Sequence, residues 1–238
     1  MKAFVYGLFL QCILDIRSRA MLITCYIVPL LFFAVMGGIF TSVMPGSELT
    51  LIQSMTVFGV TMGALIGLPP SLVEIYGSSI KKIYQANGVP LWLGLALTNL
   101  SAYFHLFVMS LIIYFTAPVI FQAKIPANPG QYFCSLAVFI AVSLSIADII
   151  GLAVKDQAKT SMFSILIFLP SILLSGIMFP ENLLPELFRI AGRIFPASWG
   201  YRLMTDRSFA FENLWPMAAI FIAASIICTV LMKNMRDK

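Results

Sequence analysis

Six long apolar runs, separated by short polar segments, dominate the pattern of the chain. Each run is continuously apolar and does not alternate, which favours helices over the strands of a membrane barrel. Each is also close to the roughly 20 helical residues that cross a hydrocarbon core of about 30 Å. The predicted spans are residues 21–43, 51–73, 91–117, 132–154, 161–179 and 214–232. The pattern therefore predicts an all-α polytopic membrane protein, with six transmembrane helices in one transmembrane domain over residues 1–238.

An amphipathic surface helix is predicted before the first span, over residues 2–19. Its apolar stripe, at helical spacing, consists of Phe4, Val5, Leu8, Phe9, Cys12, Ile13 and Ile16. Gln11, Asp15 and Arg19 lie away from that stripe, as expected for a helix on the inner membrane surface. An ordinary extension of the first span is the alternative. We expect the N-terminus to be retained, because polar residues interrupt the apolar stretch and no small-residue cleavage site follows.

The longest loop on the side of the N-terminus covers residues 74–90, between the second and third spans. It is polar enough to leave the membrane and has a short helical centre around residues 79–86, which Gly88 and Pro90 would end. The loop also carries the adjacent Lys81 and Lys82. Two lysines are also what a loop that only signals membrane topology would carry. This pattern alone therefore does not decide whether the loop has a further function.

A second long polar-apolar segment, residues 174–205, follows the fifth span. It contains an amphipathic helix at about residues 185–195, with charged residues on one side. The apolar stripe of that helix consists of Leu184, Leu187, Phe188, Ala191, Ile194 and Phe195. Trp199, Tyr201 and Trp215 are suitable interface anchors. The segment therefore predicts a helix at the outer membrane surface or a short re-entrant hairpin.

Composition and charge support the membrane assignment and orient it. The chain is 60% hydrophobic and 11% charged, whereas a soluble domain is about 45–50% apolar and about 25% charged. With the N-terminus inside, the inner segments hold 10 Lys and Arg residues and the outer segments hold 5. The positive-inside rule then predicts that both termini are cytoplasmic, in the plasma or inner membrane. The net charge of +5 is scattered between apolar runs, so nucleic acid is not an expected partner.

Catalytic and metal-binding patterns are absent from the sequence. His105 is the only histidine, which excludes multi-histidine metal sites and chains of histidine proton relays. There is no G-x-S-x-G nucleophile elbow and no Gly-Lys dipeptide, so a phosphate-binding P-loop is excluded. The four cysteines lie far apart and have no disulfide-like spacing. We therefore expect no enzyme activity, no metal and no cofactor in this chain, and an energy source in a partner subunit or an ion gradient.

Polar residues inside the predicted spans are the remaining candidates for function. Asp148 lies one to two turns from the cytoplasmic end of its span, where water or Lys155 could reach it, and we favour a structural or gating contact over an ion site. His105 and Asn99 of the third span could line a substrate path. A histidine that only forms a hydrogen bond between helices is the favoured interpretation.

The second span carries a ridge of small residues, Gly59, Gly63 and Gly67, at four-residue spacing. Such a ridge lets a neighbouring helix approach closely. Glycine is also common in membrane helices generally, so the spacing alone does not decide whether the ridge is a contact. Either interpretation concerns helix packing.

Taken in order, these segments resemble the type-2 ATP-binding-cassette (ABC) exporter permeases over almost the whole chain. The matching features are the surface helix, the polar loop after the second span, the short basic loop between Lys155 and Lys159, and a re-entrant SG-x-x-FP segment before the last span. The last of these reads Ser175-Gly176-Ile177-Met178-Phe179-Pro180 here.

The resemblance implies roles for two sets of residues. In that family the loop at residues 74–90 contains a coupling helix that docks on a separate ATPase. The matching positions are Ser78, Ser79, Lys81, Lys82, Gln85 and Asn87. The outer re-entrant segment corresponds to Gly176, Phe179, Pro180 and Phe188, and the short outer helices that follow match residues 183–195.

The function implied by the resemblance is that of the membrane subunit of an ATP-driven exporter. Such a permease forms a dimer with itself or a similar chain, lies among membrane lipids, and associates with two ABC ATPase subunits that bind ATP and magnesium. Substrates of such families include drugs, antimicrobial peptides, lipid-linked glycans and haem. A membrane-embedded accessory or sensor protein without transport is the alternative. An ion-driven transporter is disfavoured, because Asp148 is the only acidic residue well within a span.

Overall fold

The computed structural model describes residues 2–77, 83–84, 86–179, 183–206 and 211–236, and this part of the chain is helical without strands. The first half contains α1 (Lys2–Arg17), α2 (Arg19–Leu22), a π-helical turn (Ile23–Ile27), α3 (Val28–Val43), a 3-10 turn (Ser47–Leu49), α4 (Leu51–Met62), a second π-helical turn (Gly63–Gly67) and α5 (Leu68–Gly77). The second half contains α7 (Leu91–Phe121), α8 (Pro129–Ala153), α9 (Gln157–Leu173), α10 (Glu186–Gly192), α11 (Pro196–Thr205) and α12 (Phe211–Arg236).

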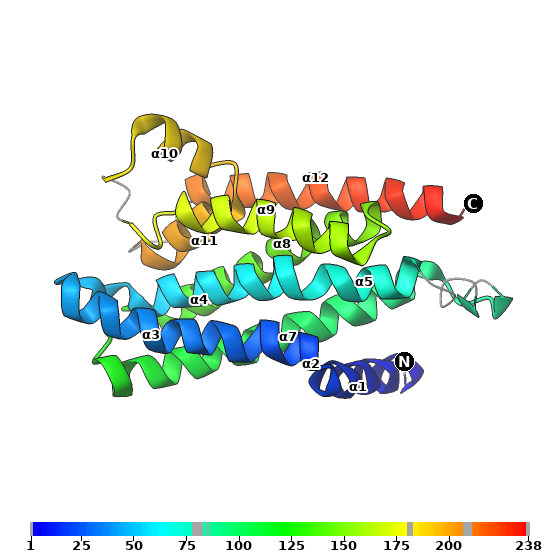
Figure 1. Ribbon diagram of the computed structural model, residues 1–238, viewed down its shortest axis with the longest axis horizontal. Helices are drawn as coiled ribbons and strands as arrows, with labels where there is room; N and C mark the ends of the chain where they lie inside the picture. Colours follow the sequence, from blue (N-terminus) through cyan, green and yellow to red (C-terminus); the bar gives the residue numbers. More distant parts are fainter. Residues whose placement is uncertain (1, 78–82, 85, 180–182, 207–210, 237–238) are drawn as a thin grey trace.

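The long helices run side by side along the longest axis of the molecule (Figure 1). The N-terminal helix α1, the end of α5 and the C-terminal end of α12 lie at one end of this bundle, and α10 and α11 lie at the other (Figure 1). The two chain termini therefore lie at the same end, as the predicted topology requires.

Five helical segments are long and apolar enough to cross a membrane. They are Arg19–Val43, Leu51–Gly77, Leu91–Phe121, Pro129–Ala153 and Phe211–Met235. They correspond to five of the predicted spans, with small shifts at their ends. Since lipid requires every backbone polar group to be satisfied within the span, these helices make the chain a multi-pass membrane protein.

The boundaries predicted for the fifth apolar run, residues 161–179, are wrong at both ends. Helix α9 begins earlier because the side chain of Asp156 caps it, accepting a hydrogen bond from the backbone N–H of Lys159 at 2.9 Å. It ends at Leu173, and Gly176 follows with a φ of 84°, a left-handed conformation that a helix cannot contain. The result is an apolar helix of 17 residues, shorter than the other five.

Two other predicted boundaries also change. The surface helix stops at Arg17, not residue 19, because Ser18 is extended and caps α2 through its hydroxyl. The outer helix predicted at residues 185–195 is shorter, covering Glu186–Gly192. A further helix, α11, begins at Pro196, which suits a first helical position because proline has no N–H to satisfy there.

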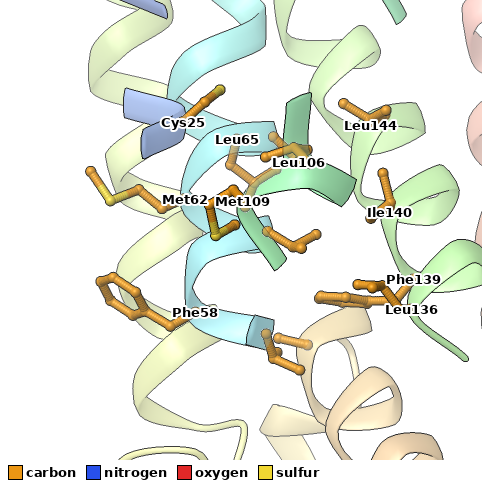
Figure 2. Close-up of a cluster of buried hydrophobic side chains, with 14 of the residues drawn as sticks. Cys25, Phe58, Met62, Leu65, Leu106, Met109, Leu136, Phe139, Ile140 and Leu144 are labelled. Carbon is orange, nitrogen blue, oxygen red and sulfur yellow. The ribbon is translucent and has the colours of Figure 1, made fainter. Parts of the chain in front are cut away.

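The middle of the bundle is the second span, α4 with α5. Every residue of α4 is buried, whereas α12 exposes large apolar side chains such as Phe221 and Ile226. Figure 2 shows the cluster around this span, where Leu106 and Met109 of α7 lie beside Met62 and Leu65. Helix α4 and its π-helical turn also contact α3, α8, α9 and α11. The second span is therefore the core around which the other helices pack.

The predicted glycine ridge forms close contacts between helices. A Cβ atom on Gly59 would lie 2.6 Å from Met109 Cε, and one on Gly63 would lie 2.3 Å from Leu106 Cδ2. A Cβ on Gly67 would lie 2.8 Å from Thr24 Oγ1 of the first span. These three glycines thus let α7 and the first span approach the central helix.

Gly151 of α8 has more rigid neighbours than the ridge glycines that face α7. A Cβ there would lie 2.7 Å from Leu72 Cβ and 3.1 Å from the carbonyl oxygen of Pro69. Neither atom is at the end of a flexible side chain, so neither can move aside without a shift of α5. This glycine fixes the distance between α5 and α8.

We expect Gly151→Ala to lower the free energy of unfolding by about 1–3 kcal/mol, the usual cost of overpacking. Gly59→Ala should cost less, because the flexible Met109 can change rotamer. Thermal unfolding of the purified protein in detergent, followed by size-exclusion chromatography, measures both. Gly130→Ala, at an exposed helical glycine, is the control and should be neutral. Equal melting temperatures for Gly151→Ala and Gly130→Ala would contradict this account.

Candidate functional site

Asp148 and Asn99, which lie in different spans, form a polar contact inside the bundle. Asn99 Nδ2 of α7 donates to Asp148 Oδ1 of α8 at 2.8 Å and also to the carbonyl oxygen of Leu95 at 3.0 Å. Asp148 is buried, with 8% of its surface exposed. The contact joins two spans, as expected for a structural or gating pair. Its partner is Asn99 and not the predicted Lys155.

A groove of about 670 Å³ opens beside this pair, between α7, α8 and α12. Leu144 and Ser145 form part of its wall, and Phe4 of α1 lies at its edge. Cys228 of α12, which also lines it, contacts the carbonyl oxygen of Ser145 at 3.8 Å. We call this the Asp148 groove. In it, one acidic side chain lies among mostly apolar residues.

His105 does not share this groove with Asn99, contrary to the suggested common path. It lies on another face of α7, where its Nδ1 is 2.8 Å from the hydroxyl of Tyr26. The two rings meet edge to face, with centroids 5.8 Å apart. His105 Nε2 is buried and has no hydrogen-bond partner among the described residues. The histidine thus forms the interhelical hydrogen bond that was the favoured interpretation, here to the first span.

Asp15 of α1 lies away from the apolar stripe, as the sequence pattern predicted, but it is buried against the protein. Its side chain accepts hydrogen bonds from the Ser101 hydroxyl of α7 and from Gln11 Nε2, the latter at 3.0 Å. Burial raises the pKa of the Asp15 carboxyl above its usual value of 3.8. The bond from Ser101 attaches the N-terminal helix to the third span, and the bond from Gln11 lies within α1.

The apolar residues of α1 point outward instead. Val5, Phe9 and Ile16 are each more than half exposed, while Asp15 is 5% exposed. In water this arrangement would be inverted, because apolar side chains would turn to the protein. Next to lipid it is favourable, since hydrocarbon accepts the apolar face and protein satisfies the polar one. Phe4, Val5, Phe9 and Ile16 of the predicted stripe are therefore on the exposed face of α1, while the rest of the stripe is half-buried and Asp15 contacts α7.

The predicted coupling loop lies partly outside the described residues. Its positions outside them are Ser78, Ser79, Lys81, Lys82 and Gln85. Asn87 is exposed, and its side-chain amide donates to the carbonyl oxygen of Ile83 at 2.8 Å. Tyr76 at the end of α5 donates its hydroxyl to the carbonyl oxygen of Leu91 at 2.7 Å. The two ends of the loop are thus tied together, at the end of the bundle that holds α1 (Figure 1).

The opposite end holds the predicted re-entrant segment. Gly176 is buried, whereas Phe179 and Phe188 are about half exposed; Pro180 lies outside the described residues. Gly192 packs so closely that a Cβ there would lie 2.2 Å from the carbonyl oxygen of Leu174. Ser198 donates to the carbonyl oxygen of Gly192 at 2.7 Å. The end of α9, α10 and α11 therefore pack into one unit.

No group of three or more His, Cys, Asp or Glu side chains gathers within the described residues in a way that suits a metal ion. Within the described residues, the polar side chains of the spans bond mostly to the backbone of their own helix, as Ser110 and Thr61 do, and a few join two helices. What the arrangement offers is a bundle with one acid-lined groove, an attached N-terminal helix and a loop with tied ends.

The model of one protein family, described as ABC-2 type transporter, matches residues 5–209 of this chain. The match runs from α1 through the end of α11, so it includes both the loop at residues 74–90 and the segment after α9. No curated protein matches the chain significantly.

We expect Asp15→Ala to weaken the docking of α1, because the buried hydroxyl of Ser101 loses its acceptor at a cost of about 1–3 kcal/mol. Faster trypsin cleavage after Arg17 and Arg19, together with a lower melting temperature, would show it. The double variant Asp15→Ala/Ser101→Ala should recover part of the loss, since both partners are then apolar.

The same contact has a pH dependence. Since the folded-state pKa of Asp15 is raised, the protonated carboxyl favours the docked helix, and ionisation opposes docking. The advantage of the wild type over Asp15→Ala should therefore shrink as the pH rises from about 4 through the raised pKa. A double variant no more stable than Asp15→Ala, or an advantage that grows with pH, would refute the assignment.

Proposed function

Because the chain belongs to the ABC-2 type transporter family, as its resemblance to type-2 ABC permeases predicted, we propose that it is the permease subunit of an ATP-driven exporter. Membrane subunits of this family pair with an ATPase subunit and are not themselves the ATPase. The observation that carries the proposal is the match across residues 5–209. The division of the bundle into one end with a tied loop and another with short outer helices supports it.

The proposed topology has six crossings, with α9 as the fifth. At 1.5 Å per residue its 17 residues extend about 26 Å, slightly less than the hydrocarbon core. Large apolar side chains exposed along it, including Leu166 and Leu169, suit contact with lipid or a second permease. Six crossings would put both termini and the loop at residues 74–90 on one side of the membrane, and the distribution of Lys and Arg favours the cytoplasm for that side.

Coupling to the ATPase is proposed at the end of the bundle that holds α1 and this loop. The docking surface consists of Ser78, Ser79, Lys81, Lys82, Gln85 and Asn87. The hydrogen bond from Tyr76 to Leu91 supports this role, because a displacement of the loop would then act on α5 and α7 together. Two ATPase subunits, with ATP and magnesium bound, would act on two permease chains, identical or similar.

Substrate is proposed to leave at the end that holds α10 and α11. Leu187 and Ile190 of α10 are mostly exposed, and the exposed pair Glu186 and Arg189 keeps this helix at the interface, because charge is costly at depth. The unit formed by the end of α9, α10 and α11 then shapes the release of a drug, antimicrobial peptide, lipid or glycan-like molecule.

The coupling proposal predicts that Lys81→Glu/Lys82→Glu abolishes association with the ATPase while membrane expression persists, because it reverses the local charge of the loop. Co-purification of the ATPase with the tagged permease measures association. Phe188→Asp, at the other end of the bundle, is the matched control: it should alter export and leave association intact. Full association and full export in the double variant would remove the loop from the docking surface. Absence of any ATPase with the wild type would instead favour an accessory or sensor protein.

Orientation can be measured in intact cells with a membrane-impermeant maleimide. In a Cys134→Ser background, which removes an exposed natural thiol, Ala127→Cys should react and Asn87→Cys should react only after the cells are opened. Both positions are exposed in the structure, so access to the reagent depends on the side of the membrane. The opposite labelling pattern would invert the proposed topology.

A further inference from the structure

The Asp148 groove combines features that no helix-packing role requires. It lies between α7, α8 and α12, and its lining is mostly apolar. Trp92 is 59% exposed and Phe221 is 42% exposed, so the groove opens on the surface of the bundle. In the proposed topology this surface faces the hydrocarbon, which gives a molecule dissolved there a sideways route to Asp148.

The Asp148 carboxyl is held in place by an uncharged partner. Asp148 Oδ1 accepts one hydrogen bond, from Asn99, and within the described residues the Asp148 side chain receives no other. No Lys, Arg or His is among the described residues that line the groove. An ionised carboxylate in a water-poor site is costly unless a proton or a cation neutralises it. The groove thus offers a carboxyl at which a bound cation can take the place of a proton.

The aromatic residues suit the same occupant. Trp92, Tyr103 and Phe221 come from two helices, and Phe4 is contributed by α1. Aromatic faces attract cations, most strongly where water is excluded. Their edges, with Leu95 and Leu144, also provide apolar contact for the body of the molecule. A small inorganic cation would gain little from such walls, whereas an organic cation would use both charge and surface.

We propose that the Asp148 groove binds lipophilic organic monocations, taken up from the membrane leaflet on the side of α1. Asp148 supplies the countercharge, Asn99 positions it, and the aromatic residues hold the apolar body. Binding requires only this chain and no ATPase. Only the further step, export of the bound cation, rests on the proposed function.

Binding is tested with the purified permease in phosphatidylcholine nanodiscs, using radiolabelled tetraphenylphosphonium. Tetraphenylborate has nearly the same shape and the opposite charge, so it separates charge from apolar partitioning. The wild type should bind the cation saturably and at least about tenfold more tightly than the anion, the ratio expected where a close charge pair forms away from water.

Asp148→Asn keeps the shape of the side chain and an acceptor for Asn99. It should weaken binding of tetraphenylphosphonium about tenfold or more, and leave that of tetraphenylborate unchanged. Asp156→Asn is the matched control, because Asp156 is exposed and asparagine also caps a helix. It should bind like the wild type. Ser225→Trp, on the α12 wall, should block the groove and weaken binding without changing its charge.

A measurement on the wild type avoids dependence on variants that fold poorly. A hydrophobic carbodiimide reacts with protonated carboxyl groups in apolar surroundings, so it should modify Asp148 while the groove is empty. Tetraphenylphosphonium should protect Asp148 by pairing with its ionised form, as mass spectrometry of the peptide can show. Equal affinity for cation and anion, unchanged binding by Asp148→Asn, or labelling without protection would overturn the proposal. Loss of cation binding in nanodiscs containing phosphatidylethanolamine would assign the groove to a lipid headgroup, and would overturn it as well.

Export is examined separately, with the permease and its ATPase in the same membrane. Binding that depends on Asp148, without ATP-dependent efflux of tetraphenylphosphonium, would retain the site and reject these cations as cargo. Failure of the ATPase to associate at all would count against the proposed function and leave the binding result standing.

Discussion

Close approach of helix backbones at small residues is the interaction on which this structure depends. In hydrocarbon, lipid tails are as apolar as leucine, so no hydrophobic force draws one helix to another, and association relies on dense packing. The central span meets this requirement on every side, since each residue of α4 is buried. The ridge glycines admit Leu106 and Met109 of α7, and Gly151 brings α8 against Leu72 of α5.

The first and second spans also share a local irregularity. A π-helical turn at Ile23–Ile27 faces another at Gly63–Gly67, and a Cβ on Gly63 would be 3.3 Å from Cys25 Sγ. A π-helical turn inserts one extra residue into the helix and rotates the residues that follow it. In both spans the direction in which the side chains point therefore shifts at the same height in the bundle. The contact between Thr24 and Gly67 depends on both turns.

Polar contacts add specificity to this packing. Most hydroxyls in the spans donate a hydrogen bond to a backbone carbonyl of their own helix, as Ser110 does to Leu106 and Thr61 does to Val57. A few polar groups reach across to another helix, joining Thr56 to Tyr132, Tyr26 to His105 and Asn99 to Asp148. Such bonds fix which faces meet, because an unpaired polar group in hydrocarbon is costly. The same requirement turns Asp15 inward and joins α1 to the third span, at the end of the bundle proposed for coupling.

The sequence by itself determined that the chain spans a membrane, roughly where most of its spans lie, and which family it resembles. These are local properties, because the transfer free energy of an apolar run and the distribution of Lys and Arg do not depend on what the run later contacts. The spacing of the glycine ridge was also readable, since it is a property of one helix, but whether the ridge is a contact was not. The end of α9 was not: the left-handed Gly176 interrupts a run that stays apolar.

Only the tertiary structure decided which face of each helix is buried and which polar residues meet. Hydrocarbon accepts an apolar side chain as readily as protein does, so the pattern on α1 could not reveal that its apolar stripe faces outward and Asp15 faces α7. Asn99 and Asp148 are 49 residues apart and on separate spans, and their contact follows from how α7 packs on α8. The Asp148 groove exists for the same reason, because three helices and the edge of α1 have to meet before one carboxylate acquires apolar walls.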